Sequence, residues 1–238
     1  MSRSSQTSSG WRGRRVDLRG HLPLAIFEGW QDGSVPGPKK AIVSPSGFAA
    51  GLSRLPYGLQ ARDFQNTMEA LYDFFHVVNG SLMERGLEWV EHLVRPAAVS
   101  NIISDLSGAA LAKYSNGLVV NKYHNGHPDL IPRGQYPDDA VKAGAEGVEV
   151  KSTRNAVADT HGAREGWVCQ FNYKTDGGPI IGDREPTRIT HIYVARVELE
   201  DFRRNERHTE RGTNTSTLHR EGLAKLRAGL VYQDPSVT

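Results

Sequence analysis

The sequence predicts a mixed α/β (α+β) domain with a central mixed β-sheet flanked by helices. Two observations lead to this prediction. Helical periodicity dominates the first half of the chain after an N-terminal tail, and short β-type runs separated by Gly, Pro and Asp clusters follow it. Helices and strands that are grouped rather than strictly alternating are typical of α+β domains. A length of 238 residues is sufficient for one sizeable core.

The helices are predicted from apolar spacing and from capping residues. Asp63 is expected to cap a helix in which apolar residues recur at spacings of three and four until Asn79-Gly80, where it should end. Ser81 and Glu84 have the spacing of a capping box, which predicts a second helix that stops at Arg95-Pro96. The remaining helices are expected over about 99–114 and 218–228.

The strands are predicted from short runs rich in apolar and β-branched residues. They are expected over about 118–123, 148–152, 167–173 and 189–199. The connection 154–166 contains two glycines and little helical periodicity, so a loop is expected there. Asp159, His161 and Arg164 lie in this loop and are candidates to approach a ligand, although a plain surface loop is the simpler interpretation.

The chain is expected to form one domain behind a tail. Residues 1–15 are basic, rich in serine and poor in apolar side chains, which predicts a flexible segment. Residues 16–238 should form a single domain. Its helical part is expected at about 60–115, its catalytic sheet at about 117–200 and its C-terminal part at about 201–238.

Composition limits the classes of protein to which the chain can belong. The formal net charge of +2 is too small to establish a nucleic-acid partner by itself. No stretch approaches the roughly 20 apolar residues that span a bilayer, and no secretory signal is evident, so a cytoplasmic protein away from membranes is expected. The single cysteine, Cys169, excludes an internal disulfide and a cysteine-based zinc cluster.

Two short segments carry the residues that indicate chemistry. The first reads His127-Pro128-Asp129-Leu130-Ile131, and the second reads Gly147-Val148-Glu149-Val150-Lys151-Ser152-Thr153. Side chains alternate between the faces of a strand, so Glu149 and Lys151 should project from one face and the flanking valines from the other. Asp129 precedes an apolar pair, which places it where a neighbouring strand begins. Two nearby carboxylates are suitable ligands for Mg²⁺.

These residues resemble the PD-(D/E)xK phosphodiesterase superfamily over about residues 118–153. The resemblance implies a restriction-endonuclease-like core in which Asp129, Glu149 and the backbone carbonyl of Val150 bind Mg²⁺, with Mn²⁺ able to substitute. It also implies that Lys151 positions or helps to deprotonate the attacking water, leaving a 5′-phosphate and a 3′-hydroxyl. The family core has a helix after the lysine strand, and the loop expected at 154–166 departs from that pattern.

The family resemblance implies a site-specific endonuclease of double-stranded DNA, most like a type II restriction enzyme. Such enzymes commonly act as homodimers because a palindromic DNA site imposes two-fold symmetry. A junction resolvase or nicking enzyme of DNA repair and recombination is the first alternative. A DNA-binding module without catalysis is the second. The late arginines Arg203, Arg204 and Arg207 are the preferred phosphate contacts.

Several residues remain open alternatives at this level. Asp138 and Asp139 follow a second proline and compete with Asp129 for the role of first carboxylate. Asp105 would join the metal site only if the preceding helix turned it inward. Gln170 resembles the glutamine that some related nucleases place beside the catalytic lysine. His124 and His127 lack further zinc ligands at a suitable spacing, so structural or DNA-contact roles are favoured over zinc.

Overall fold

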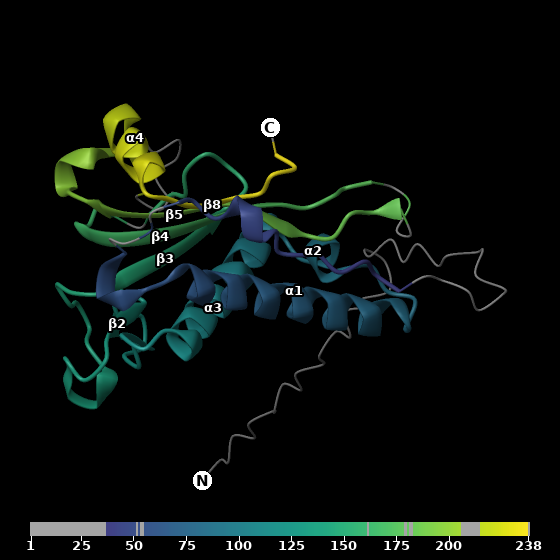
Figure 1. Cartoon of the computed structure of the whole chain (residues 1–238), viewed down its shortest axis with the longest axis horizontal. Helices are drawn as coiled ribbons and strands as arrows, with labels where there is room; N and C mark the ends of the chain where they lie inside the picture. Colours follow the sequence, from purple (N-terminus) through teal and green to yellow (C-terminus); the bar gives the residue numbers. More distant parts are fainter. Residues whose placement is uncertain are drawn as a thin grey trace, which may run out of the picture. The chain divides into compact units, whose positions relative to one another are not determined.

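The computed structural model describes residues 37–50, 52, 55–160, 162–178, 180, 183–205 and 215–237. The predicted tail at 1–15 lies outside this range, as do His161 and Arg207. Within it, a six-stranded mixed sheet is accompanied by helices (Figure 1), as the sequence predicts. None of the helices in the described ranges is long and apolar enough to cross a membrane.

The central sheet has the strand order β1-β2-β3-β4-β5-β8. Its strands are β1 (Leu118–Val120), β2 (Leu130–Pro132), β3 (Val148–Thr153), β4 (Gly166–Lys174), β5 (Arg188–Val197) and β8 (Leu230–Gln233). All neighbouring pairs are antiparallel except β3 and β4, which run parallel. A separate antiparallel pair is formed by β6 (Phe202–Arg204) and β7 (Ser216–Leu218).

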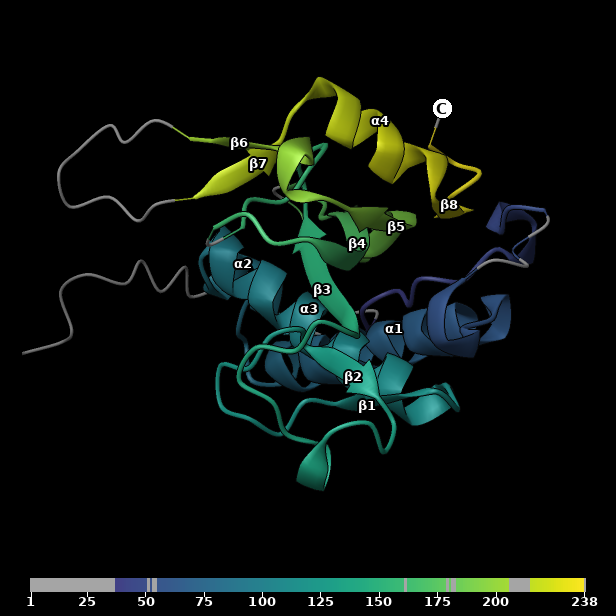
Figure 2. The ribbon, with the colours of Figure 1, turned by 90° about the vertical axis from the view of Figure 1, so that its left-hand side faces the viewer.

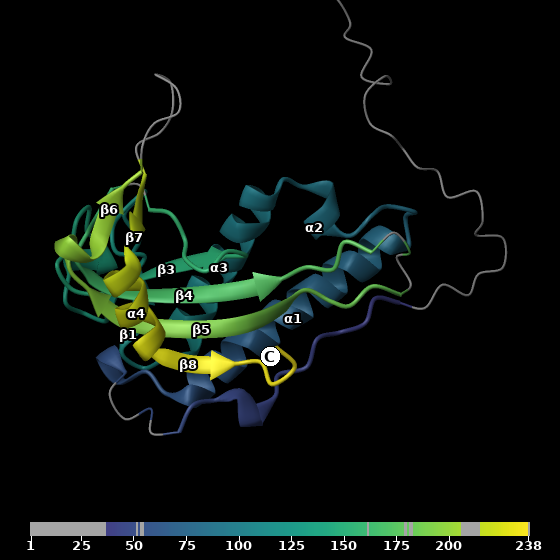
Figure 3. The same ribbon diagram turned by 90° about the horizontal axis from the view of Figure 1, so that it is seen from above.

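Helices cover both faces of the sheet (Figures 2 and 3). The helices are α1 (Ala61–Met83), α2 (Val90–Leu93), α3 (Pro96–Tyr114) and α4 (Arg220–Ala228). The main core lies between the sheet and the pair α1 and α3, and it includes Val148 and Val150 of β3. A smaller core lies on the other face, where Leu218 and Leu226 pack against β5. Residues of β3 therefore alternate between two different environments.

The ends predicted for the first helix are wrong. The N-cap is Gln60, whose backbone N–H donates to Asp63 Oδ2 at 2.9 Å, so Asp63 is the third helical residue of a capping box. The helix continues past Asn79-Gly80 to Met83. Asn79 is buried, accepts from Val90 N at 2.9 Å and donates to Glu91 Oε2 at 2.9 Å. These contacts across to α2 satisfy its amide inside a helix, where asparagine is otherwise unfavourable.

The second predicted helix is also wrong in its start and length. Ser81 lies inside α1 and Glu84 is the C-cap of that helix, so they form no capping box. Only the four residues of α2 are helical before α3, which begins at Pro96 instead of residue 99. Proline is favoured at this first helical position because its missing N–H would have no partner there.

The strand predictions are correct in existence and differ at their ends. The strand expected at 118–123 stops at Val120, because the Asn121 side chain turns the chain by donating to the carbonyls of Pro128 and Val141. The strand expected at 189–199 ends at Val197. Leu218, expected to begin the last helix, ends β7 instead, and that helix begins at Arg220. The strand β8 is not anticipated by the sequence patterns.

The connection after β3 is irregular, as expected from its glycines. Residues 154–160 and 162–165 contain no helix. Because β3 and β4 are parallel, the chain must cross from one end of the strand pair to the other, a passage that is usually helical. Here an irregular segment makes the crossing.

Candidate active site

β3 presents Glu149 and Lys151 on the face opposite α3. Val148 and Val150 are 0% and 3% exposed and belong to the core beneath the sheet. Glu149 and Lys151 alternate with them, and their side chains retain 16% and 27% exposure. This alternation follows from the strand backbone and matches the sequence prediction. One strand thus brings a carboxylate and an ammonium group together in a partly enclosed place.

Asp129 reaches the same strand from β2. β2 and β3 share a single residue pair, Leu130 with Val148, so the edge of β3 beyond that pair is free to receive a side chain. Val150 N donates to Asp129 Oδ2 at 2.8 Å across this edge. The N–H and C=O of one strand residue point to the same edge, so the Val150 carbonyl also faces the side of Asp129. Two carboxylates and one carbonyl therefore lie near one another.

The competing Pro-Asp pair does not reach this place. Asp138 and Asp139 sit in the 3-10 turn η4 (Pro137–Asp139) with φ values of 55° and 53°. Asp139 pairs with Lys122 Nζ at 3.3 Å, and neither acid lines the cavities around Lys151. Asp105 does line the larger of these cavities, but it is solvent-exposed. Among the described acids, Asp129 is the one that the fold places beside Glu149.

The environment separates the two carboxylates electrostatically. Burial, together with the charge of Glu149, raises the pKa of Asp129 to about 6. Burial also opposes ionisation of Glu149, but contact with His127 and the charge of Lys151 outweigh it and lower the pKa of Glu149 to about 2. Neighbouring acids whose pKa values are driven apart in this way are typical of functional sites.

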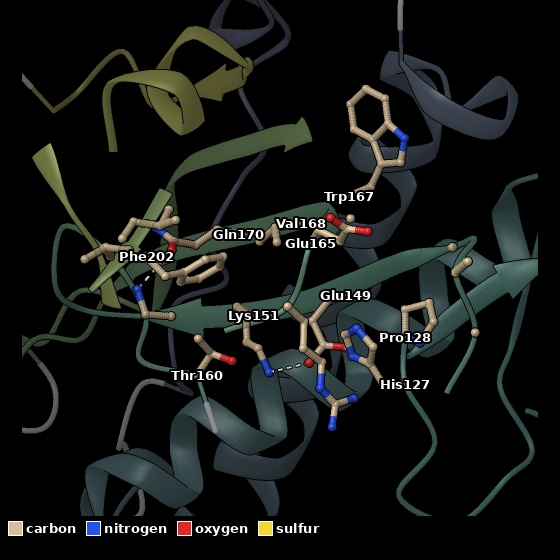
Figure 4. Close-up of a pocket in the computed structure, with 18 residues that line it drawn as sticks. His127, Pro128, Glu149, Lys151, Thr160, Glu165, Trp167, Val168, Gln170 and Phe202 are labelled. Atoms are coloured by element: carbon tan, nitrogen blue, oxygen red, sulfur yellow. Dashed lines mark hydrogen bonds and ion pairs between the residues drawn. The ribbon is translucent and has the colours of Figure 1, made fainter. Parts of the chain in front are cut away.

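Glu149 is held from two sides (Figure 4). Lys151 Nζ lies 2.5 Å from Oε1, and His127 Nδ1 lies 2.7 Å from Oε2. Oε2 is buried and lacks a well-aligned hydrogen-bond donor. The sequence pattern favoured a structural or DNA-contact role for His127 over zinc, but it did not predict the contact of His127 with Glu149. Its position two residues before Asp129 was the available signal.

The donor set suits a hard divalent cation. The described residues contain no group of three or more His, Cys, Asp and Glu side chains that would enclose a metal, so they offer no zinc cluster. Mg²⁺ uses one or two carboxylates and retains several waters, which two acids and a carbonyl can satisfy. The misaligned buried oxygen of Glu149 and the raised pKa of Asp129 both fit carboxylates that a cation would stabilise.

Two cavities lie next to β3. The larger has a volume of about 890 Å³ and is lined by α3, by the connection before Asp129 and by residues that follow Lys151. The smaller has a volume of about 40 Å³ and lies among His127, Glu149, Gln170 and Phe202 (Figure 4). Lys151 borders both cavities. A substrate in the larger groove would therefore meet Asp129 and Lys151, whereas Glu149 lines the smaller cavity.

Gln170 lies next to Lys151 but is engaged elsewhere. The two residues are register partners across β3 and β4. Gln170 is only 1% exposed, and its amide bonds to the backbone of Ala156 and Ala158 and to Asn172. Gln170 therefore organises the segment after β3. The alternation of side chains along the strand predicted that Gln170 and Asn172 share one face. It did not predict that they bind the segment after β3.

The remaining candidate residues lie on β6 and on the segment between β3 and β4. Arg203 and Arg204 are exposed on β6, and Arg164 lines the smaller cavity. Asp159 accepts a hydrogen bond from Thr217 Oγ1 at 2.7 Å, which ties the segment after β3 to β7.

Neither protein-family models, nor curated proteins, nor solved structures give a match to this chain.

Proposed function

We propose that this chain is a divalent-metal-dependent endonuclease that hydrolyses double-stranded DNA to 5′-phosphate and 3′-hydroxyl ends. The observation that carries the proposal is the meeting of Asp129, Glu149 and the Val150 edge beside Lys151. Carboxylates on either side of an ammonium group that borders two cavities suit attack on a phosphate ester, because they can hold a cation and balance developing charge.

The topology around these residues supports a restriction-endonuclease-like core. α3 is followed by the antiparallel series β1, β2 and β3, with the acids at the start of β2 and on β3. β4 then lies parallel to β3. This is the order of elements that the resemblance to the PD-(D/E)xK superfamily implies, except that an irregular segment replaces the helix between the last two strands.

Each residue has a defined task in this proposal. Asp129, Glu149 and the carbonyl of Val150 hold Mg²⁺ or Mn²⁺, which would supply Lewis acidity at the phosphate and a more acidic bound water. Lys151 leaves Glu149 Oε1, orients the attacking water and offsets negative charge on the phosphate. His127 remains on Glu149 and keeps that carboxylate in place. Val148 and Val150 fix the strand by packing beneath the sheet.

We further propose a type II restriction enzyme that acts on a palindromic site as a homodimer. A two-fold symmetric DNA site is matched by two copies of one chain, each of which cuts one strand. The arginines Arg203 and Arg204 are exposed on β6 and would provide phosphate contacts. Phosphate contacts position DNA and leave sequence reading to groups that face the bases.

The test is digestion of a supercoiled plasmid of known sequence, with end mapping. Mg²⁺ or Mn²⁺ should give discrete fragments, Ca²⁺ should support binding with little turnover, and EDTA should stop cleavage. Cutting confined to branched or damaged duplexes would instead indicate a repair nuclease. A chain that binds DNA identically with and without metal and never cuts would be a binding module, and the proposal would fail.

A further inference from the structure

The irregular segment 154–160 after the catalytic strand is fastened along its length. A segment without regular structure must find partners for its backbone groups outside itself. Here two buried side chains of β4 and the backbone of β7 supply many of these hydrogen-bond partners. Five residues of the segment, from Arg154 to Asp159, line the same groove as Asp129 and Lys151. We call residues 154–160 the wall segment.

The inner side of the wall segment is bound by two amides of β4. Gln170 Oε1 accepts from Ala158 N at 3.0 Å, and Gln170 Nε2 donates to Ala156 O at 3.2 Å. Asn172 Nδ2 donates to Asn155 O at 2.5 Å. The two amides also bond to each other, with Gln170 Nε2 donating to Asn172 Oδ1 at 2.7 Å. The pair thus acts as one clamp.

The outer side is bound by the β6–β7 pair. Thr160 and Ser216 exchange two backbone hydrogen bonds, at 2.9 Å from Thr160 N and 2.8 Å from Ser216 N. Thr217 Oγ1 donates to Asp159 Oδ1 at 2.7 Å. The wall segment therefore connects the sheet to the β6–β7 pair, in which β6 carries Arg203 and Arg204.

The clamp is in register with the catalytic strand. Gln170 is the partner of Lys151, and Asn172 is the partner of Thr153. Thr153 Oγ1 in turn accepts from Asn155 N at 3.0 Å, where the wall segment begins. The clamp residues are 1% and 9% exposed, so they do not contact a substrate themselves. Their effect on a substrate must be transmitted through the wall segment.

We propose that Gln170 and Asn172 are positioning residues that hold the wall segment and the β6–β7 pair as one arm, which places DNA phosphates relative to Lys151. This inference rests on the proposed nuclease function. Arg154, Arg203 and Arg204 are exposed on the arm and supply its phosphate contacts. The clamp takes the place of the helix that the family core has after the lysine strand, because it fixes a crossing that has no internal hydrogen-bond ladder.

The first experiment measures the backbone protection of the wall segment and does not depend on catalysis. Gln170→Met and Asn172→Leu keep volume and remove the amide bonds. Hydrogen exchange of the full-length protein should accelerate at least about tenfold in the peptide covering 154–160, while α1 stays protected. The matched control is Asn79→Leu, which removes a buried amide between α1 and α2. It should not accelerate exchange selectively in the wall segment.

The second measurement separates positioning from stability. With saturating DNA and Mg²⁺, both clamp variants should lose about 10–100-fold in kcat, since small misplacement of a reacting group is costly. DNA Kd measured in Ca²⁺ should change less than about threefold, and Asn79→Leu should keep wild-type kcat, with all assays run where each variant is folded. Normal kcat in the clamp variants, or unchanged exchange in 154–160, overturns the positioning role. A wild-type chain that never cleaves DNA would instead overturn the proposed function.

Discussion

The two faces of β3 differ in what their residues do for the protein. Val148 and Val150 face the core beneath the sheet and are almost fully buried. Glu149 and Lys151 face the opposite side and bring charge into a partly enclosed place. The apolar face stabilises the fold, whereas on the charged face His127 and Lys151 outweigh the cost of burying Glu149 and lower its pKa. Substitutions on one strand should therefore divide into those that change stability and those that change activity.

The largest expected effect is loss of activity from the charged face. Glu149→Ala and Lys151→Ala should each reduce cleavage of plasmid DNA by more than about 10³-fold while the circular dichroism spectrum is preserved. Val148→Ala is the matched substitution on the apolar face. It should lower the free energy of unfolding by on the order of 1–3 kcal/mol and keep cleavage. Near wild-type cutting by either charged-face variant would remove β3 from the proposed active site.

The next prediction compares the two Pro-Asp positions. Asp129→Asn should abolish cleavage, because it removes a charged ligand but preserves shape and the acceptor for Val150 N. Asp138→Asn and Asp139→Asn should reduce cleavage only modestly, since these acids lie in a turn away from the site. The measurement is the initial rate of plasmid nicking at fixed Mg²⁺. The opposite ranking would keep the proposed nuclease function but move its first carboxylate.

His127 tests whether Glu149 needs support from a neighbour. His127→Leu should weaken metal binding by about 10–100-fold, the usual loss when a group that orients a ligand is removed. Calorimetric titration with Mn²⁺ gives the affinity independently of cleavage. His127→Asn places an N–H near the position of Nδ1 and should recover part of the affinity. Equal metal affinity in wild type and His127→Leu would show that Lys151 and the strand alone hold Glu149.

The raised pKa of Asp129 predicts a gain of stability when its charge is removed. The pKa of Asp129 rises from an ordinary value of 3.8 to about 6, so ionisation of this group destabilises the folded state. The contribution of protonated Asp129 to the free energy of unfolding is fully present below about pH 4 and is lost as the pH rises through 6. Metal-free Asp129→Asn should therefore be more stable than wild type above pH 6, by on the order of 1–3 kcal/mol.

Thermal unfolding in EDTA measures this gain across the pH range. The difference in Tm between Asp129→Asn and wild type should shrink as the pH falls from about 6 towards 4, where both carry an uncharged group. An Asp129→Asn variant that is less stable than wild type at pH 8 would contradict the conclusion that ionisation of Asp129 destabilises the folded protein. Excess Mg²⁺ should reduce the difference, because the proposed cation stabilises only the protein that retains the carboxylate.

The smallest expected effect concerns single phosphate contacts. DNA affinity should fall as salt increases, because cationic side chains release counterions from DNA. Arg203→Ala and Arg204→Ala should each reduce the slope of log affinity against log salt by about one. Binding in Ca²⁺ between about 50 and 200 mM salt measures that slope. An unchanged slope in both variants would move the phosphate contacts to other elements.

Local sequence patterns were sufficient to predict the charged face of β3 and much of the sheet. The alternation around Glu149 and Lys151 depends only on strand geometry, and the apolar pair after Asp129 marks the start of β2. These are local signals, so they could be recognised without knowing the fold. The irregular crossing after β3 was also predicted locally, from its glycines and its lack of helical periodicity.

The polar side chains that hold these segments in place could not be predicted without the packing of the elements. Asn79-Gly80 has the pattern of a helix end, yet Asn79 lies inside α1 because it bonds to residues of α2. His127, in the connection before β2, meets Glu149 of β3, and Gln170 binds the backbone after β3. Each of these contacts joins residues that are distant in sequence or on different elements. Periodicity describes one element at a time, whereas a hydrogen bond between elements depends on how they pack.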